Sequence, residues 1–385
     1  MIDRISNDIA LLIIDYLCPT DLLCTEQTCE RFRSLVARND IWQPLYARLF
    51  PLSSLGLQHC QTWKHVYLYK AGLQHAWKKG SVQCILAQDA HTDAVNYITA
   101  QKSAGPFNNL FATCSFDRTI KLWRKPTTRT PYCPPLCTLS GHENAVWSLA
   151  WGSNTSELFS ASFDGTIRSW DVEMAACSRE LCANADRLLC MAIEKESVWT
   201  GSLTGHLIQW SNASSNTMTG RTQCITPCIS ALHKHNHLLY VGGVKHVEIW
   251  DDRSLHAPLT LLQGHNQAVM DITSFSECMV MSVSKDGTLK GWDATGLTST
   301  PLMDVPVHKA AVRSIATCDD LVVTSSNDST VSLWNVVGEK QNRSLQKLRD
   351  FAVHSKQVPS VDIDECHLYT ASCDSTMTIH EYTIC

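Results

Sequence analysis

Hydrophobic and polar positions follow two different patterns in this chain, and the change falls near residue 80. In the N-terminal part, apolar residues such as Ile9, Ile13 and Leu17 recur at helical spacing. Further along, short β-branched runs such as Leu158–Ser162 and Leu321–Ser326 end in tight-turn residues, which is typical of strands. We therefore predict a small all-α part, residues 1–50, a helical linker, 51–80, and a mainly β part, 81–385.

Tryptophan marks an internal repeat in the β part. Six tryptophans recur at steps of 40 to 47 residues, and a further step reaches His380; the six are Trp123, Trp170, Trp210, Trp250, Trp292 and Trp334. Most units carry Ser-x-Asp-x-Thr just before the tryptophan, and five carry a His with Val four residues later, as in His142 and Val146. A period of this length with short strands predicts a β-propeller of seven blades. We expect Val82–Leu86 to pair with the last blade and remove its open edge.

These units resemble the WD-repeat family. Gly-His and Trp-Asp dipeptides carry the resemblance, at Gly141–His142, Gly264–His265, Trp170–Asp171, Trp250–Asp251 and Trp292–Asp293. It covers residues 82–385. The third unit departs from the pattern at Asn184 and Thr204, and the fourth at Val244.

The resemblance implies that the recurring polar residues are structural. In the family, His, Ser or Thr, Asp and Trp form a buried hydrogen-bond network within each blade. The residues to which this role is carried over are His142, Asp164, Trp170, His265, Asp286, Trp292, His308, Asp328 and Trp334. A catalytic triad is not needed in every unit, so the repeated His, Ser and Asp do not indicate an enzyme.

The N-terminal helical pattern resembles an F-box. The matching residues are Ile5–Ser6, Ile9, Leu12–Ile13, Tyr16–Leu17, Asp21–Leu22, Cys29 with Phe32, and Ile41–Trp42. The resemblance implies binding to a Skp adaptor, and through it to a cullin–RING ligase, by Ile5, Ile9, Leu12, Ile13, Leu17, Leu22 and Trp42. Ser6 stands where the family has Pro, and Ser can cap the first helix instead.

F-box/WD proteins are substrate receptors of Skp–cullin–F-box ubiquitin ligases, and their propeller face holds the protein to be ubiquitinated. The corresponding positions follow the Val of the His-x-x-x-Val segment or precede the turn Asp. The predicted substrate face is Phe116, Trp147, Phe163, Met270, Lys285 and Arg313. Because only Lys285 and Arg313 are cationic, we expect an apolar site with a small basic edge. The alternative is that these side chains only pack the top of the propeller.

Composition and charge limit the partners, the cellular location and the bound groups that we expect. The formal net charge of −5 gives no overall attraction to nucleic acid or to anionic membranes. Neither a membrane span nor a secretory signal is expected, which predicts a cytoplasmic or nuclear protein with reduced cysteines. Histidines at 233, 235 and 237 lie near Cys224 and Cys228, but we expect a turn between Leu232 and Leu238. We therefore predict neither a metal site nor a cofactor.

Two functions remain open. The first is a substrate receptor of a Skp–cullin–F-box ligase, which is not itself an enzyme because the recruited proteins carry the transfer chemistry. The alternative is a WD-repeat scaffold whose divergent F-box, with Ser6, does not recruit cullin. An enzyme built on a propeller is disfavoured, since the sequence has no Walker loop, dinucleotide glycine motif or nucleophile elbow.

Overall fold

The structure is a computed structural model of the 385-residue chain. It describes residues 33–34, 36–38, 40–44, 62–68, 72, 77, 82–87, 90–102, 109–126, 134–152, 156–182, 186–194, 197–211, 218–276, 278–294, 298–338 and 343–382. The chain divides into two compact units, Met1–Gly80 with Ile384–Cys385 and Ser81–Thr383.

The described residues of the first unit are mostly helical. Helical residues are 33–34, 36, 40–44, 63–68, 72 and 77. Trp42 is wholly buried, donates a 2.5 Å hydrogen bond from Nε1 to the carbonyl of Val36, and lies 5.1 Å from the ring of Tyr67. Trp77 and Val66 are also buried. Over the described ranges, no helix is long and apolar enough to cross a membrane.

The second unit is a seven-bladed β-propeller, as predicted. Each blade is an antiparallel sheet of four strands. The first three blades are β2 (Val95–Ala100), β3 (Leu110–Ser115), β4 (Ile120–Arg124) and β5 (Pro135–Leu139); β6 (Val146–Trp151), β7 (Glu157–Ser162), β8 (Thr166–Asp171) and β9 (Ala176–Cys182); and β10 (Leu188–Glu194), β11 (Ser197–Ser202), β12 (His206–Ser211) and β13 (Met218–Gln223). The next three are β14 (Ala231–His235), β15 (Leu238–Gly242), β16 (His246–Asp251) and β17 (Thr260–Gln263); β18 (Val269–Ser276), β19 (Met279–Ser284), β20 (Thr288–Asp293) and β21 (Met303–Pro306); and β22 (Val312–Cys318), β23 (Leu321–Ser326), β24 (Val331–Val337) and β25 (Ser344–Phe351). The seventh blade is β26 (Ser360–Ile363), β27 (His367–Ala371), β28 (Met377–Tyr382) and β1 (Val82–Ala87).

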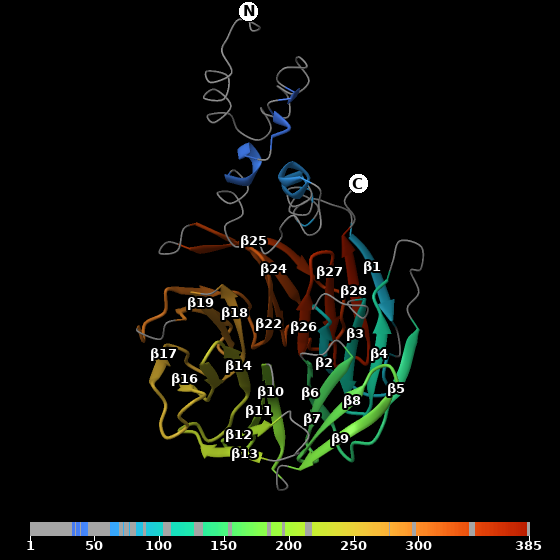
Figure 1. The fold of residues 1–385 in the computed structure, drawn as a ribbon, viewed down its shortest axis with the longest axis vertical. Helices are drawn as coiled ribbons and strands as arrows, with labels where there is room; N and C mark the ends of the chain where they lie inside the picture. Colours follow the sequence, from blue (N-terminus) through green and yellow to red (C-terminus); the bar gives the residue numbers. More distant parts are fainter. Residues whose placement is uncertain are drawn as a thin grey trace, which may run out of the picture. The chain divides into compact units, whose positions relative to one another are not determined.

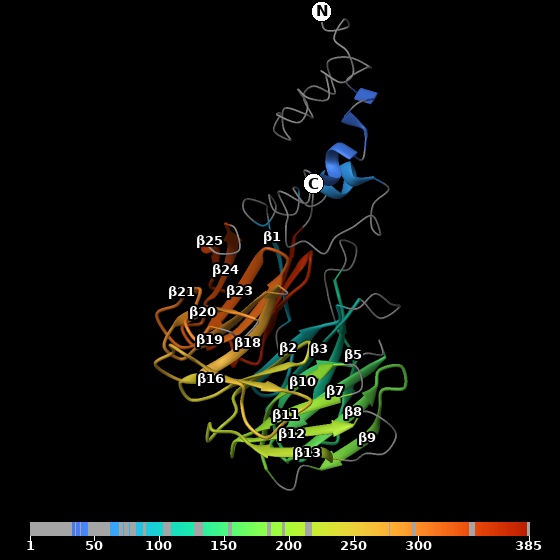
Figure 2. The ribbon, with the colours of Figure 1, turned by 60° about the vertical axis from the view of Figure 1, so that its left-hand side comes forward.

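The blades follow one another around the ring in chain order (Figures 1 and 2). Their first strands contact each other in the sequence β2, β6, β10, β14, β18, β22 and β26, and β26 contacts β2 again. The fourth strand of the last blade is β1, which pairs antiparallel with β28 from Val82↔Tyr382 to Ala87↔Met377. This is the closure that the sequence predicts, and it pairs the strand edge that the last blade would otherwise leave open.

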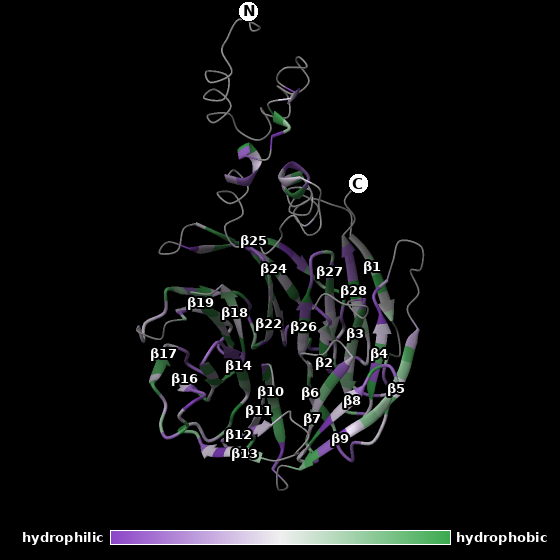
Figure 3. Cartoon of the chain, viewed as in Figure 1, coloured by the Kyte–Doolittle hydropathy of each residue, from purple (hydrophilic) through white to green (hydrophobic). Residues whose placement is uncertain are grey.

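The core lies between neighbouring blades. Neighbouring sheets share hydrophobic clusters, and the cluster that contains Trp170 also includes Leu122 and Cys114 of the preceding blade. Around the closure, Phe111 of β3 lies 5.2 Å from Tyr369 of β27. Figure 3 shows hydrophobic and hydrophilic segments alternating along the blades, which is expected where strands are partly solvated. Stability is therefore spread around the whole ring.

Candidate functional site

A chain of polar side chains ties each regular blade together. In the second blade, Nδ1 of His142 lies 2.8 Å from Oδ2 of Asp164, and Nε2 lies 2.7 Å from Oγ of Ser160. That same Oγ accepts a 2.8 Å hydrogen bond from Nε1 of Trp170. Burial alone would raise the pKa of Asp164, but hydrogen bonds from His142 and Thr166 hold it well below its usual range.

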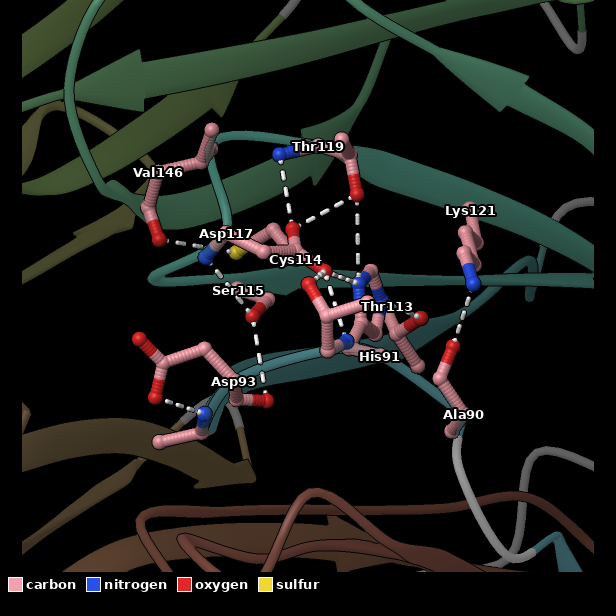
Figure 4. A network of polar contacts seen from close by, with 12 residues as sticks. Ala90, His91, Asp93, Thr113, Cys114, Ser115, Asp117, Thr119, Lys121 and Val146 are labelled. Carbon is pink, nitrogen blue, oxygen red and sulfur yellow. Dashed lines mark hydrogen bonds and ion pairs between the residues drawn. The ribbon is translucent and has the colours of Figure 1, made fainter.

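The first blade repeats this arrangement (Figure 4). His91 lies 2.9 Å from both Asp117 and Thr113, and Trp123 donates to the Thr113 hydroxyl at 2.8 Å. The other residues of the predicted network also lie together: His265 with Asp286 (3.2 Å) and Trp292 with Ser282 (2.8 Å), and His308 with Asp328 (3.3 Å) and Trp334 with Thr324 (3.0 Å). These contacts occupy the imidazoles and carboxylates within the blades.

In the third blade the acid and the imidazole have exchanged places: the acid is on the loop before the first strand, and the imidazole is on the third strand. Asp186 lies on the loop before β10, on the side where regular blades have His, and accepts a hydrogen bond from the Thr204 hydroxyl. His206, four residues before Trp210, lies 3.3 Å from Asp186. In the sequence, this blade departs from the repeat at Asn184 and Thr204, and the repeat pattern did not predict these contacts. The missed signal was the His four residues before the tryptophan, where regular blades carry Thr.

The fourth blade uses a buried glutamate instead. Glu248 is wholly buried and accepts hydrogen bonds from the backbone of Thr226 (2.6 Å) and Ile225 (3.3 Å) and from Nε1 of Trp250 (3.0 Å). The Glu248 carboxylate thereby accepts hydrogen bonds from the loop before β14 and from strand β16. Val244, at the usual Asp position, contributes only its backbone N–H, which donates to the Thr226 hydroxyl at 3.2 Å, and the residue is 42% exposed.

The predicted face residues after the Val positions are placed by β-bulges. The pairing of the first and second strands shifts register around Asn96, Trp147, Leu189, Met270 and Arg313. A bulged residue has no partner on the neighbouring strand, so the bulge re-aims its side chain. With Ser230 and Pro359, these five line one cavity at the mouth of the central channel.

The residues before the turn Asp lie beside the bulges. Phe163 donates its backbone N–H to the carbonyl of Ala145 at 3.0 Å, next to the bulge of Trp147. The Phe163 and Trp147 rings stack at 4.5 Å, and Phe116 meets Trp147 edge-on at 5.6 Å. The guanidinium of Arg187 lies 5.6 Å from the centre of the Phe163 ring. The structure thus brings together the three predicted aromatic residues and adds Arg187, which sequence reasoning missed.

The other predicted face residues line a second cavity of about 240 Å³. Met270, Lys285 and Arg313 meet Trp147 there. Burial lowers the pKa of the Arg313 guanidinium, because the charged form loses hydration. All six predicted face residues therefore belong to the aromatic cluster or to this cavity, and Trp147 belongs to both.

The central channel is a separate polar cavity of about 490 Å³. Asp271 lines it and joins two blades, accepting hydrogen bonds from the Ser314 hydroxyl (2.8 Å) and the Ile315 backbone (3.0 Å). Burial raises the pKa of Asp271 to about 6. Asp362 joins the last and first blades in the same way, through the backbone of Ala100 at 2.8 Å.

The turn expected between Leu232 and Leu238 is present, at Asn236 and His237. Strand β14 continues to His235, and the turn begins at Asn236, which has a positive φ of 53°. His233 lines the channel, and its buried Nε2 has no hydrogen-bond partner. Where the chain is described, no three His, Cys, Asp or Glu side chains are placed to hold a metal ion.

Most of the predicted adaptor-binding residues lie outside the described residues. These are Ile5, Ile9, Leu12, Ile13, Leu17 and Leu22. Trp42 is described and is wholly buried, and its part in adaptor binding stays a prediction.

Two family models match the chain. The model "WD domain, G-beta repeat" matches residues 82–124, 133–171, 256–293 and 299–335, and the "F-box-like" model matches residues 7–48. The propeller and its blade networks define a WD-repeat protein. Because an F-box-like domain precedes the propeller, the chain belongs to the F-box/WD-repeat proteins. Both domains are of the adaptor or scaffold kind.

Curated relatives match at lower identity. The chain is 26% identical over 246 residues to "Ribosome biogenesis protein WDR12 homolog" of Nematostella vectensis, covering 54% of this chain and 56% of the relative. A protein of the same name from Chlamydomonas reinhardtii is 25% identical over 283 residues, covering 69% and 59%. "Protein SPA1-RELATED 3" of Arabidopsis thaliana is 25% identical over 241 residues, covering 59% and 28%. The chain thus spans less than two thirds of the length of each of these relatives.

Proposed function

We propose that the chain is the substrate-recognition subunit of a Skp–cullin–F-box ubiquitin ligase. The F-box docks the Skp adaptor, the propeller face binds the protein to be ubiquitinated, and the recruited enzymes carry out the transfer. The chain itself supplies no catalytic group. We place this activity in the cytoplasm or the nucleus. The observation that carries the proposal is an F-box-like domain at residues 7–48 followed in the same chain by a WD-repeat propeller.

The propeller face supports the second half of the proposal. The polar residues that repeat around the ring are occupied within the blades, so they are not free to act on a substrate. The bulged residues instead present Trp147, Met270 and Arg313 at the channel mouth. Aromatic, Met and Arg side chains are the types that anchor protein interfaces.

Binding to purified Skp adaptor tests the proposal. The full chain is immobilised beside the double variant Ile9→Asp/Leu17→Asp, and the captured adaptor is measured. We expect capture by the wild type and loss of capture by the variant, because charges at two apolar contact positions oppose burial. The propeller melting transition should be the same in both proteins. If a folded wild-type chain captures no adaptor, the proposal fails.

A second candidate is a WD-repeat scaffold that acts in ribosome biogenesis and does not recruit cullin. The names of the relatives from Nematostella vectensis and Chlamydomonas reinhardtii favour it. Sedimentation of cell extracts separates the two functions. Co-sedimentation of the chain with pre-ribosomal particles, together with absent adaptor capture, supports the scaffold and contradicts our main proposal.

A further inference from the structure

The seam between the last and the first blade has a hydrophobic core of its own. Phe111 and Trp123 of the first blade share a buried cluster with Tyr369 of the last blade. From β1, Ile85 and Ala87 pack against this cluster and are partly buried. The buried residues of the cluster therefore come from outside β1.

Two ion pairs cross the same seam. Nζ of Lys125 lies 2.8 Å from Oδ2 of Asp364. Nζ of Lys102 lies 2.7 Å from Oδ1 of Asp362. Between described residues, a single other ion pair joins neighbouring blades, and it links the third blade to the fourth. Ion pairs between blades are thus concentrated where the first and last strands of the propeller meet.

The pair of Lys125 and Asp364 is largely shielded from solvent. The two side chains are 14% and 16% exposed. Burial alone would raise the pKa of Asp364, but His367 and Lys125 hold it well below its usual range. The Tyr369 hydroxyl also donates to Asp364, at 2.8 Å. Because salt screens a shielded pair less than an exposed one, this pair stabilises the seam more than a surface pair does.

Hydrogen bonds also join the first strands of the two blades directly. The Ala100 backbone of β2 donates to Asp362 of β26 at 2.8 Å, and the Ile98 backbone donates to the Ser360 hydroxyl at 3.2 Å. The exchange of these two amides therefore reports whether the seam is closed.

Strand β1 is bound more loosely than the seam. It is the edge strand of its sheet and pairs with β28 along its six residues. Cys84 is exposed. In the sequence, β1 directly follows the first compact unit. It therefore takes part in neither the ion pairs nor the hydrogen bonds that cross the seam.

We propose that β1 is a detachable strap, which can unpair from β28 while the ion pairs and the buried cluster keep the ring closed. Unpairing adds six residues, up to about 20 Å of extended chain, to the segment that precedes the ring. This second statement gains its meaning from the proposed function, because the added chain changes the distance that the F-box-like domain can span from the cargo. The closure of the ring does not depend on that function.

Hydrogen exchange of the full wild-type chain gives the first test, read by mass spectrometry with single-residue fragmentation. We expect the β1 amides to exchange at least tenfold faster than those of Ile98 and Ala100. Their rate should also be insensitive to low urea, because a local opening exposes little surface. If the β1 amides and the two seam amides exchange at the same rate, the proposal fails.

Paired variants give the second test. The strap variant carries Cys84→Pro and Ile85→Pro. Neighbouring residues of an edge strand direct their N–H groups to opposite sides, so one of the two prolines removes a donor to β28. The seam variant carries Lys102→Met and Lys125→Met, which remove both charges. Its matched control carries Lys309→Met and Lys356→Met, at exposed positions.

The combinations separate the strap from the seam. With the strap variant alone, the Ile98 and Ala100 amides should exchange within threefold of the wild type. Adding the seam variant should speed their exchange at least tenfold, whereas adding the control should not change it. Loss of protection, or of folding, in the strap variant alone would overturn the proposal, and so would full protection when strap and seam variants are combined. Adaptor capture by the wild type tests the proposed function separately.

Discussion

At the scale of single residues, hydrogen-bond partners decide which side chains are structural. The His, Asp and Trp spacing predicted the network of the regular blades, because each partner occupies a fixed place in the repeat. The spacing could not predict how the third and fourth blades satisfy the same donors. Asp186 and Glu248 sit at positions where regular blades do not carry an acid. Their roles depend on the three-dimensional positions of neighbouring donors.

Replacing the acid of a regular blade should lower stability. We expect Asp164→Ala to reduce the free energy of unfolding by about 1–3 kcal/mol, because His142, Thr166 and the Glu143 backbone lose their acceptor. Urea denaturation measures this change, with the exposed Glu173→Ala as the control. A midpoint equal to that of the control would contradict the structural role.

At the scale of elements, every blade is a four-stranded sheet, but the third and fourth blades have altered polar networks, and five of the seven have a bulge between their first two strands. The tryptophan steps predicted the number of blades, because each step contains one complete sheet. They did not predict that β14 would continue to His235. A run of polar residues is typical of a turn, yet the first strand of a blade faces a polar channel and tolerates them. The bulges leave the face positions Arg313 and Trp147 without a partner on the neighbouring strand.

The fourth blade provides an element-scale prediction. Glu248→Ala should reduce the free energy of unfolding by about 2–4 kcal/mol, because Trp250 and the backbone of Thr226 and Ile225 lose one shared acceptor. Glu248→Gln should cost less, since its amide oxygen still accepts. Denaturant unfolding followed by tryptophan fluorescence measures both, beside exposed Glu143→Ala. Equal stability of the two Glu248 variants would contradict the role of Glu248 as a shared hydrogen-bond acceptor.

At the scale of the whole molecule, buried histidines link stability to pH. His380 takes the place of tryptophan in the last blade and is only 2% exposed. Burial lowers its pKa to about 4, whereas an unfolded histidine titrates near 6.5. Its contribution to stability is therefore fully present above about pH 6.5 and is lost as the pH falls toward 4. The pH dependence from Asp271 has the opposite sign. Because its pKa is raised to about 6, its contribution to the free energy of unfolding falls as the pH rises.

The variant His380→Phe separates these effects, because both proteins retain Asp271. Between pH 7 and 4.5, we expect the wild type to lose about 2 kcal/mol more unfolding free energy than the variant. Denaturation curves at several pH values measure the difference. Parallel pH profiles for the two proteins would show that His380 does not titrate in this range.

The pairing of β1 with β28 also determines when the propeller can close during synthesis. The ribosome makes β1 before the other strands of the propeller and β28 after them, so the ring cannot close before β28 has been made. At about 5–20 residues per second, β1 waits on the order of 15–60 s for its partner. During that interval it presents an unpaired edge that chaperones can bind. A message truncated before β28 leaves that edge permanently open, so such products should be cleared by proteolysis instead of accumulating.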